Sequence, residues 1–295
     1  MSFIANFKAK LRRRYYVVGY GSVKNVNIST KSTASDIRWI TYKGYKEDWI
    51  ADPYILSETY SQIDFLVEEW VEKKHKGRLV KISLDKRNHN VKKTVILDLS
   101  THLSFPSIIK ENDNIFICPE NAASGKQKIY RFNPTNECLE SPVTIIEEPL
   151  LDVNIVKIED VYYAFGVKLL DGDKGDNCHL KIFKSEKLLG KYKLIQEIEN
   201  EFAQERGAGA FFWHKGKLIR PVQNCEGDYG RNVIFKEITI ENGIFKENVV
   251  GSLLPSRQYP EGLHTFNVLG DTFVIDGMGY NVGNWMTRLK KILHK

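Results

Sequence analysis

Short runs of β-branched and aromatic residues recur along most of the chain, separated by polar stretches. Each run has the length and composition of a β-strand, and turn sequences such as His214-Lys215-Gly216 and Glu241-Asn242-Gly243 lie between many of them. Only the two ends of the chain have a helical pattern. This arrangement predicts an all-β sandwich, barrel or propeller. The predicted strands are Tyr15–Val18, Ile63–Val67, Leu79–Leu84, Thr94–Leu97, Ile115–Cys118, Lys128–Phe132, Val153–Ile158, Val161–Gly166, Leu180–Phe183, Phe211–Trp213, Lys217–Arg220, Val233–Ile238 and Phe273–Asp276.

A long period in the sequence favours the propeller. Five segments with unusual residues interrupt the strand pattern, and the spacings between their markers are 54, 46, 54 and 58 residues. One four-stranded blade takes about 40–50 residues in known propeller repeats. We therefore expect a five-bladed β-propeller in which each marker begins an innermost strand facing the central channel. The markers are Asp52, Pro106, Asp152, Arg206 and His264.

Both ends of the chain have basic amphipathic patterns. Near the C-terminus, apolar residues fall at helical spacing with basic residues on their flanks, and Phe3, Phe7 and Leu11 give a weaker version near the N-terminus. We expect a basic N-terminal segment over residues 1–14, the propeller over 15–280, and a short basic helix over 281–295. Such ends can bind an anionic membrane surface, or they can dock onto the propeller or onto a second subunit.

The net charge of +6 divides unevenly along the chain. The residues before Asp36 and after Asp276 include eleven basic and no acidic ones, so the body between them carries a net charge of −5. An acidic body argues against nucleic acid as a partner. The four cysteines are too widely spaced for a disulfide scaffold or a zinc ribbon. The sequence has no membrane-spanning run and no secretory pattern, so we expect a cytoplasmic protein. It has no metal motif and no cofactor motif, so we expect neither group. The basic ends lead us to expect a position at the inner face of the membrane.

Twelve short motifs resemble a known family in their order. The motifs begin at the first marker and end after the last. The resemblance as a whole runs from about Tyr16 to Gly277. The family is the N-terminal domain of plant glucosamine inositolphosphorylceramide transferases, together with bacterial relatives found with polysaccharide-synthesis genes. The motifs are Ala51-Asp52-Pro53-Tyr54, Phe65-Leu66-Val67-Glu68, Lys76-Gly77-Arg78, His102-Leu103-Ser104-Phe105-Pro106, Cys118-Pro119-Glu120-Asn121, Leu151-Asp152, Arg206-Gly207-Ala208-Gly209, Arg220-Pro221-Val222-Gln223, Tyr229-Gly230, Glu237-Ile238, Leu263-His264-Thr265 and Asp276-Gly277.

That domain is similar in turn to the five-bladed propellers of family 43 glycoside hydrolases. The resemblance implies a glycan-handling propeller with its site at the channel mouth, and it implies that the transferase chemistry of the plant proteins belongs to a separate C-terminal domain. Asp52 matches the Asp-Pro that supplies the base in the hydrolases. Their second blade usually carries another Asp-Pro, whereas Phe105-Pro106 stands here, which puts hydrolysis by their mechanism in doubt.

Glycoside chemistry usually needs two carboxyl groups across the sugar, one acting as base or nucleophile and one as acid. The candidates are Asp52, Glu120 and Asp152. Each could instead be a satisfied loop carboxylate. His102 lies near the position of the missing Asp and could replace it.

Other residues suit substrate binding. Arg206 lies among glycines, which allow a ligand to approach the backbone, and a guanidinium can hold a carboxylate or phosphate in a bidentate manner. Alternatively, Arg206 forms an ion pair with an acidic residue in the interior. Gln223, Tyr229 and His264 offer hydrogen bonds and stacking surfaces for sugar hydroxyls and rings.

Three functions remain open from the sequence. The first is a sugar transferase of bacterial surface-polysaccharide assembly, in which Asp52 activates the acceptor and Arg206 holds an anionic nucleotide or phosphosugar donor. The second is a family 43 type hydrolase, and the third is a non-catalytic glycan-binding propeller. Expected partners are a carbohydrate or sugar-phosphate substrate and either a partner transferase or a second copy of the chain.

Overall fold

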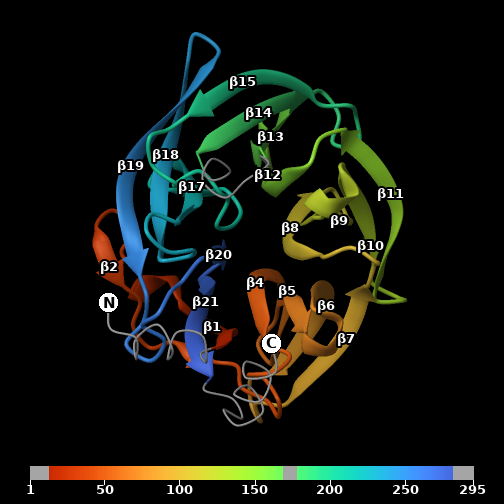
Figure 1. Cartoon of the computed structure of the whole chain (residues 1–295), viewed down its shortest axis with the longest axis vertical. Coiled ribbons are helices and arrows are strands. Elements are labelled where there is room, and N and C mark those ends of the chain that lie inside the picture. The colour runs from red at the N-terminus through yellow and green to blue at the C-terminus, as the bar shows by residue number, and fades with distance from the viewer. Residues whose placement is uncertain (1–12, 169–177, 282–295) are drawn as a thin grey trace, which may run out of the picture.

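The computed structural model describes residues 13–168 and 178–281, which form five β-sheets arranged in a ring around a central channel (Figure 1). The predicted five-bladed propeller is therefore confirmed, and each of the thirteen predicted strands overlaps an observed strand, with only Phe211 falling outside one. The predicted terminal helices fall on residues outside the described part of the chain. Among the described residues, no helix has the length and apolarity needed to cross a membrane.

We number the blades in chain order from Ile50, and each blade runs from an inner strand at the channel to an outer strand. Blade 1 contains β4 (Ile50–Glu58), β5 (Gln62–Val71), β6 (Lys76–Asp85) and β7 (Val91–Leu97); blade 2 contains β8 (Ser104–Glu111), β9 (Asn114–Glu120), β10 (Gln127–Asn133) and β11 (Cys138–Ile146); blade 3 contains β12 (Leu150–Ile158), β13 (Val161–Lys168), β14 (His179–Ser185) and β15 (Lys193–Glu199); blade 4 contains β16 (Phe212–His214), β17 (Lys217–Asn224), β18 (Asn232–Glu241), β19 (Ile244–Leu254) and β2 (Lys31–Thr33); blade 5 contains β20 (Phe266–Leu269), β21 (Thr272–Asn281), β1 (Arg13–Ser22) and β3 (Arg38–Trp39). Three short 3-10 helices, η1 (Val23–Asn25), η2 (Glu72–Lys74) and η3 (Ala122–Ser124), lie in connections.

The N-terminal residues close the ring. Strand β1 pairs along its whole length with β21, from Arg13 opposite Asn281 to Ser22 opposite Thr272, while β2 adds a parallel strand outside β19. Blades 4 and 5 are thus each built from both ends of the chain. The two described ends are direct strand partners, so the chain enters and leaves the propeller at one place, as the sequence predicts for a closed ring.

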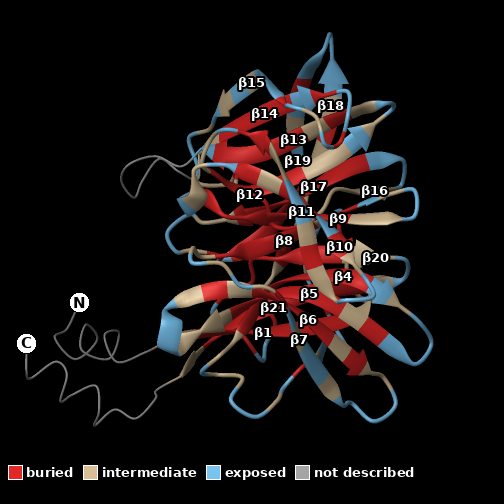
Figure 2. Cartoon of the chain, turned by 90° about the vertical axis from the view of Figure 1, so that its right-hand side faces the viewer, coloured by how far each residue is buried: buried red, intermediate tan, exposed pale blue. Residues whose placement is uncertain are grey.

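Apolar side chains of neighbouring blades fill the space between the sheets. One cluster joins Val18 and Tyr20 of blade 5 to Ile55 and Phe65 of blade 1, and the rings of Tyr20 and Phe65 lie 5.9 Å apart. Figure 2 shows the same pattern for the whole molecule, with buried residues running through the blades and exposed residues at the loops. All four cysteines are free, and Cys118 is buried in the core between blades 2 and 3.

A bulge recurs at the start of the inner strand in blades 1, 2 and 3. Asp52, Phe105 and Asp152 all have left-handed backbone conformations, with φ values of 51°, 44° and 47°, and each lies at a break in the register with the next strand. A β-bulge redirects a side chain relative to the regular pleat. Aspartate tolerates the left-handed region better than a bulky residue does, so Phe105 is the unusual member of the set.

The markers in the other two blades lie just ahead of the inner strands. Arg206 precedes β16 and His264 precedes β20, where isolated bridges join Gly207 to Val222 and Gly262 to Met278. The prediction that each marker begins an inner strand therefore holds for Asp52, Pro106 and Asp152, and is displaced by a few residues in blades 4 and 5.

Candidate active site in the central channel

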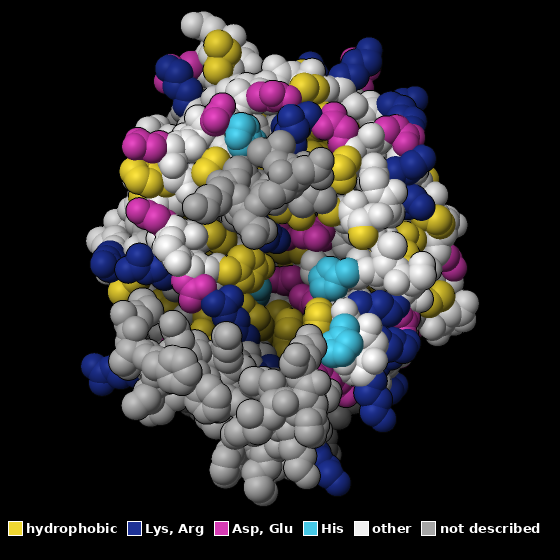
Figure 3. Space-filling model, viewed as in Figure 1, with side chains coloured by type: hydrophobic (Ala, Val, Ile, Leu, Met, Phe, Trp, Pro, Cys, Tyr) yellow, Lys and Arg dark blue, Asp and Glu magenta, His cyan; other side chains and the backbone are white. Residues whose placement is uncertain are grey.

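Acidic side chains from several blades converge at one end of the channel. Figure 3 shows acidic and histidine side chains in the hollow at the centre of this face. Five carboxyl groups are involved, and each is at least nine-tenths buried. They are Asp52, Glu68, Glu120, Asp152 and Asp276.

Asp52 lies at the meeting point of blades 1, 2 and 5. Its Oδ2 accepts the backbone N–H of Phe105 at 3.0 Å, and its Oδ1 accepts the Thr265 hydroxyl at 2.9 Å. The Nε2 of His264 lies 3.5 Å from the same Oδ1. Burial raises the pKa of Asp52, the neighbouring His264 charge opposes that rise, and the charges of Asp152 and Asp276 add to it.

His264 lies between two carboxylates. Its Nδ1 is 2.5 Å from Asp276 Oδ2, and its ring stacks on Tyr16 with centroids 4.6 Å apart. Burial lowers the pKa of His264, but the nearby carboxylates outweigh burial and raise it from 6.5 to about 9. The imidazole is therefore a cation at neutral pH, held against Asp52.

Asp52, His264 and Asp276 offer three ligand atoms within 4.8 Å of one another, a spacing compatible with a metal ion. Hydrogen bonds already use the carboxylate oxygens, however. Asp276 Oδ1 accepts the backbone N–H groups of His264 and Thr265, and its Oδ2 accepts the backbone N–H of Asp52 at 3.4 Å. The imidazolium of His264 already places a cation between the two carboxylates, so a metal fits this cluster poorly.

Arg206 is paired with two acids. Its Nε donates to Asp152 Oδ2 at 2.7 Å, and its Nη2 lies 3.5 Å from Glu120 Oε2. Gln223 completes the cluster by donating from Nε2 to the same Asp152 oxygen at 2.9 Å and to the Gly207 carbonyl at 2.8 Å. The interior ion pair that the sequence left open as an alternative for Arg206 is therefore present.

Glu120 and Tyr229 flank this ion pair. Burial, followed by repulsion from Asp152, raises the pKa of Glu120 well above its usual range, although Arg206 opposes the rise. The Arg206 guanidinium lies over the Tyr229 ring, 5.2 Å from its centroid, and the Tyr229 ring meets His264 edge-on at 5.5 Å. Tyr229 thus links the Asp152 and Asp52 clusters.

Glu68, near the end of β5, belongs to the site although the sequence analysis does not select it as a candidate. Its nearest basic partner is His102, whose Nε2 lies 3.6 Å from Glu68 Oε1. Burial and the four other channel carboxylates raise the pKa of Glu68 well above its usual range. All eight residues selected from the sequence lie in this one connected cluster, with His102 joined to it through Glu68, while their roles stay predictions.

The glycines beside Arg206 serve packing between strands. A Cβ at Gly207 would lie 2.7 Å from the Asp152 carbonyl oxygen, and one at Gly209 would lie 1.9 Å from the Phe266 carbonyl oxygen. Close packing of strands is therefore a simpler physical reason for these glycines than room for a ligand. They allow the loop before β16 to cross close to blades 3 and 5.

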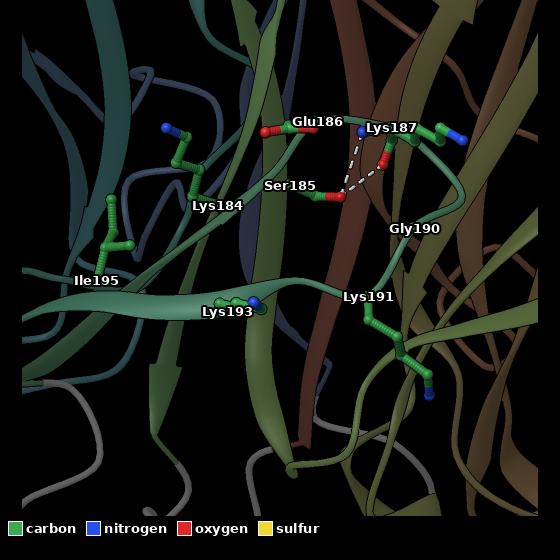
Figure 4. A pocket seen from close by; sticks show the side chains of 8 residues that line it. All are labelled: Lys184, Ser185, Glu186, Lys187, Gly190, Lys191, Lys193 and Ile195. Atoms are coloured by element: carbon green, nitrogen blue, oxygen red, sulfur yellow. Dashed lines mark hydrogen bonds between the residues drawn. The ribbon is translucent and has the colours of Figure 1, made fainter.

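A second hollow lies outside the channel, on the outer part of blade 3 between β14 and β15 (Figure 4). Its only buried polar side chain is that of Ser185, whose hydroxyl bonds to the backbone of Lys187. The charged side chains are exposed and point in different directions in Figure 4. No set of groups converges here, so we place the functional site in the channel. The lining residues are Lys184, Ser185, Glu186, Lys187, Gly190, Lys191, Lys193 and Ile195.

The fold and the site together define a five-bladed propeller with an acid-lined channel. Solved structures share this fold. A family 43 β-1,3-galactosidase superposes with a TM-score of 0.55 at 8% identity, covering 79% of this chain and 90% of that one. An α-L-arabinanase from Cellvibrio cellulosa superposes with a TM-score of 0.51 at 11% identity, covering 70% of this chain and 81% of the other.

Sequence comparison identifies the family. Residues 32–276 match the N-terminal family of glucosamine inositolphosphorylceramide transferase 1, and the chain belongs to this family. The glucosamine inositolphosphorylceramide transferase 1 proteins of Oryza sativa subsp. japonica and Arabidopsis thaliana are each 28% identical, over 200 and 215 residues. These alignments cover 65% and 68% of this chain but 26% and 27% of the plant proteins. The chain thus spans about a quarter of the length of the relatives it matches.

Proposed function

We propose that this propeller transfers a sugar to an acceptor hydroxyl in the assembly of a bacterial surface polysaccharide. The observation that carries the proposal is the set of buried channel carboxyls in unlike environments. Asp152 is paired with Arg206, whereas the pKa values of Glu68 and Glu120 are raised. Carboxyl groups whose environments differ in this way are suited to the base and acid roles of glycosyl transfer.

Asp52 is the proposed base. The bulge in β4 directs it toward the channel, and the His264 cation beside it stabilises its carboxylate form. Its carboxylate would take the proton of the acceptor hydroxyl as that oxygen attacks the sugar. The acid is one of the two buried glutamates, Glu68 or Glu120, and Asp152 acts by holding Arg206 in place.

The donor follows from the charge of the channel. The sequence predicts an anionic donor held by Arg206, but the two ion pairs of this guanidinium compete with any such anion. Around it lie five carboxyls, so a phosphate group would meet a largely acidic surface. This favours an uncharged glycoside donor, whose leaving oxygen needs a proton from a carboxylic acid.

Hydrolysis is the second candidate, because Asp52 and Asp152 occupy equivalent bulges in blades 1 and 3. The same machinery would then use water as the acceptor. Phe105 occupies the corresponding position of blade 2, where the family 43 resemblance calls for an Asp, and this difference favours transfer over hydrolysis by the family 43 mechanism.

The place where the chain ends leave the propeller bears on its location. Arg13 and Asn281 are strand partners, and Tyr16, three residues from Arg13, stacks on His264 in the channel. Basic ends bound to the anionic inner face of a membrane would therefore bring the channel mouth toward that membrane. We propose this orientation for a peripheral cytoplasmic protein, working with a partner transferase or a second copy of the chain.

Binding and turnover can be tested with two groups of compounds. Thermal-shift measurements would compare neutral oligosaccharides, such as β-1,3-galactotriose and xylotriose, with sugar nucleotides and sugar phosphates. Product analysis in ¹⁸O-labelled water would then separate transfer from hydrolysis, because only hydrolysis places the label on the released sugar. We expect glycoside binding and unlabelled transfer products. Labelled sugar would support the hydrolase.

The variant Asp52→Asn tests the base. It should keep the shape of the site and lower turnover by about 10²- to 10⁴-fold, whereas Asp64→Asn, at a half-buried position of β5 outside the channel cluster, should leave turnover unchanged. Full turnover in Asp52→Asn would contradict both enzymatic candidates. Binding without any turnover in the wild-type chain would leave the non-catalytic glycan-binding role.

A further inference from the structure

Glu68 differs from the other channel carboxyls in its partners. Asp152 and Glu120 face Arg206, and Asp276 faces the His264 cation. Among the described residues, Glu68 has no lysine or arginine at ion-pair distance, and its one basic neighbour there is His102, at 3.6 Å. The charge state of His102 therefore decides how Glu68 is held.

The backbone of Gly77 fixes the proton of His102. The Gly77 N–H donates to His102 Nδ1 at 2.8 Å, so this nitrogen must act as an acceptor and carry no proton. The neutral ring then has its proton on Nε2, which is the nitrogen that faces Glu68. Burial and the charge of Arg206 lower the pKa of His102, in agreement with a neutral ring.

Gly77 is built into this contact. A Cβ at position 77 would lie 2.4 Å from Glu68 Oε1, 2.4 Å from the Leu103 carbonyl oxygen and 2.9 Å from His102 Cε1. Any side chain here would push Glu68 and His102 apart. The close approach of β6 to both residues therefore depends on glycine.

We propose that Glu68 is the protonated acid of this site, and that the His102 Nε2–H, held toward Oε1 by Gly77, favours the proton on Oε2; the assignment rests on the proposed function. His102 is a positioning residue in this arrangement. As the acceptor oxygen forms its bond to the sugar carbon, the bond between that carbon and the leaving oxygen breaks; the electron pair stays on the leaving oxygen, and Glu68 Oε2 gives it a proton. The acceptor oxygen gives its own proton to Asp52, so the site as a whole neither gains nor loses a proton.

The charges around the pair favour this assignment over Glu120. A proton on Glu120 competes with the Arg206 cation, which stabilises the carboxylate form at 3.5 Å. The charges of four other channel carboxyls disfavour a further negative charge on Glu68. They are Asp52, Glu120, Asp152 and Asp276, while His102 is itself faced by Arg206, Lys76 and Asp152.

Infrared spectroscopy can locate the proton without any substrate. At neutral pH, Glu68→Gln should remove part of the protonated-carboxyl band of the wild-type chain. The control is Glu69→Gln, next along β5, because Glu69 lies in ion pairs with Arg78 at 2.6 Å and Lys93 at 2.5 Å. That variant should leave the band unchanged. An unchanged band in Glu68→Gln would overturn the proposal.

Two further measurements test the positioning and the acid role. The ¹⁵N spectrum of His102 should show the proton on Nε2, and a proton on Nδ1 would overturn the role given to Gly77. In turnover, Glu68→Gln should slow glycosides with poor leaving groups by about 10²- to 10⁴-fold and dinitrophenyl glycosides much less, since these need no acid. An equal loss for both would reduce Glu68 to a structural residue. If the wild-type chain neither binds nor turns over any glycoside, the proposed function is wrong. The infrared result would still decide whether Glu68 is protonated.

Discussion

His264 Nδ1 lies 2.5 Å from Asp276 Oδ2, and its Nε2 lies 3.5 Å from Asp52 Oδ1, so one buried imidazole joins two carboxylates. Its pKa is raised from 6.5 to about 9, because the carboxylates outweigh the effect of burial. When folding raises the pKa of a group, the group stabilises the fold fully at pH values below its pKa in the unfolded chain. This stabilisation is lost as the pH rises through the pKa of the group in the folded chain. The free energy of unfolding should therefore fall by roughly 3 kcal/mol between pH 6.5 and pH 9 through this group.

Urea unfolding at a series of pH values would measure this fall. NMR titration of His264 in the folded chain supplies a second measurement that needs no variant, and His214, at an exposed turn of blade 4, is the internal control. Burial and Lys215 lower the pKa of His214, so the two histidines should titrate on opposite sides of 6.5. Titration of His264 at or below 6.5 would contradict the ion-pair assignment.

Arg206 should prove essential for stability. The variant Arg206→Met leaves Asp152 and Glu120 buried without their cation, and removal of one partner from a buried ion pair costs about 3–5 kcal/mol. Denaturant unfolding measures this loss, with the exposed Arg257→Met as control, for which we expect a change within about 0.5 kcal/mol. A stable Arg206→Met that has lost only sugar-phosphate binding would instead support the anionic donor predicted from the sequence.

The two strands next to the inner strand of each blade can be predicted from the sequence, whereas the inner strands β4, β8 and β20 are indicated only by their markers and most outer strands have no signal. Middle strands are buried on both faces, so they read as apolar runs. The outer strand β15 is mostly exposed and reads Lys-Leu-Ile-Gln-Glu-Ile-Glu, which has no strong strand signal. Strand β11 contains Pro142, and it was missed for a similar reason. These strands form because the blade already provides an edge to pair with.

The sequence singles out residues of the channel cluster where a residue stands next to a break in the strand pattern. Asp52 and Asp152 mark bulges, and bulges interrupt the regular alternation. Glu68 lies inside a strand beside Glu69, and two adjacent glutamates read as an ordinary solvent-exposed strand end. Gly77 and His102 come close to Glu68 only in the folded structure. A weak signal was available, because all three residues lie in motifs of the family resemblance.

Gly209 should tolerate no side chain. Its Cβ would lie 1.9 Å from the Phe266 carbonyl oxygen, where the loop before β16 crosses blade 5. We expect Gly209→Ala to lower the free energy of unfolding by about 3 kcal/mol, because backbone rather than a flexible side chain must move. Gly216→Ala is the matched control: its φ is +77° and a Cβ would meet nothing within 4 Å, so only the left-handed backbone costs about 1 kcal/mol. Equal losses in the two variants would mean that the loop relaxes without cost.

A second buried ionic cluster stabilises blade 4. Arg220 Nη1 lies 3.1 Å from Glu205 and 2.6 Å from Glu247, and Lys236 Nζ lies 2.5 Å and 2.9 Å from the same two acids. The Arg220 guanidinium also lies 5.7 Å from the centre of the Phe165 ring in blade 3. Two cations and two anions balance one another, so loss of either cation leaves a buried negative charge without a partner.

Arg220→Met should therefore lower the free energy of unfolding by about 3–5 kcal/mol, with little dependence on salt. The exposed pair Lys217–Glu237, also in blade 4 and 2.7 Å apart, is the control. Lys217→Met should cost less than about 1 kcal/mol, because exposed ion pairs are weak, and added salt should reduce that small loss further. Denaturant unfolding at low and high salt measures both variants. A salt-sensitive loss in Arg220→Met would mean that water reaches the cluster and that the seam between blades 3 and 4 opens in solution.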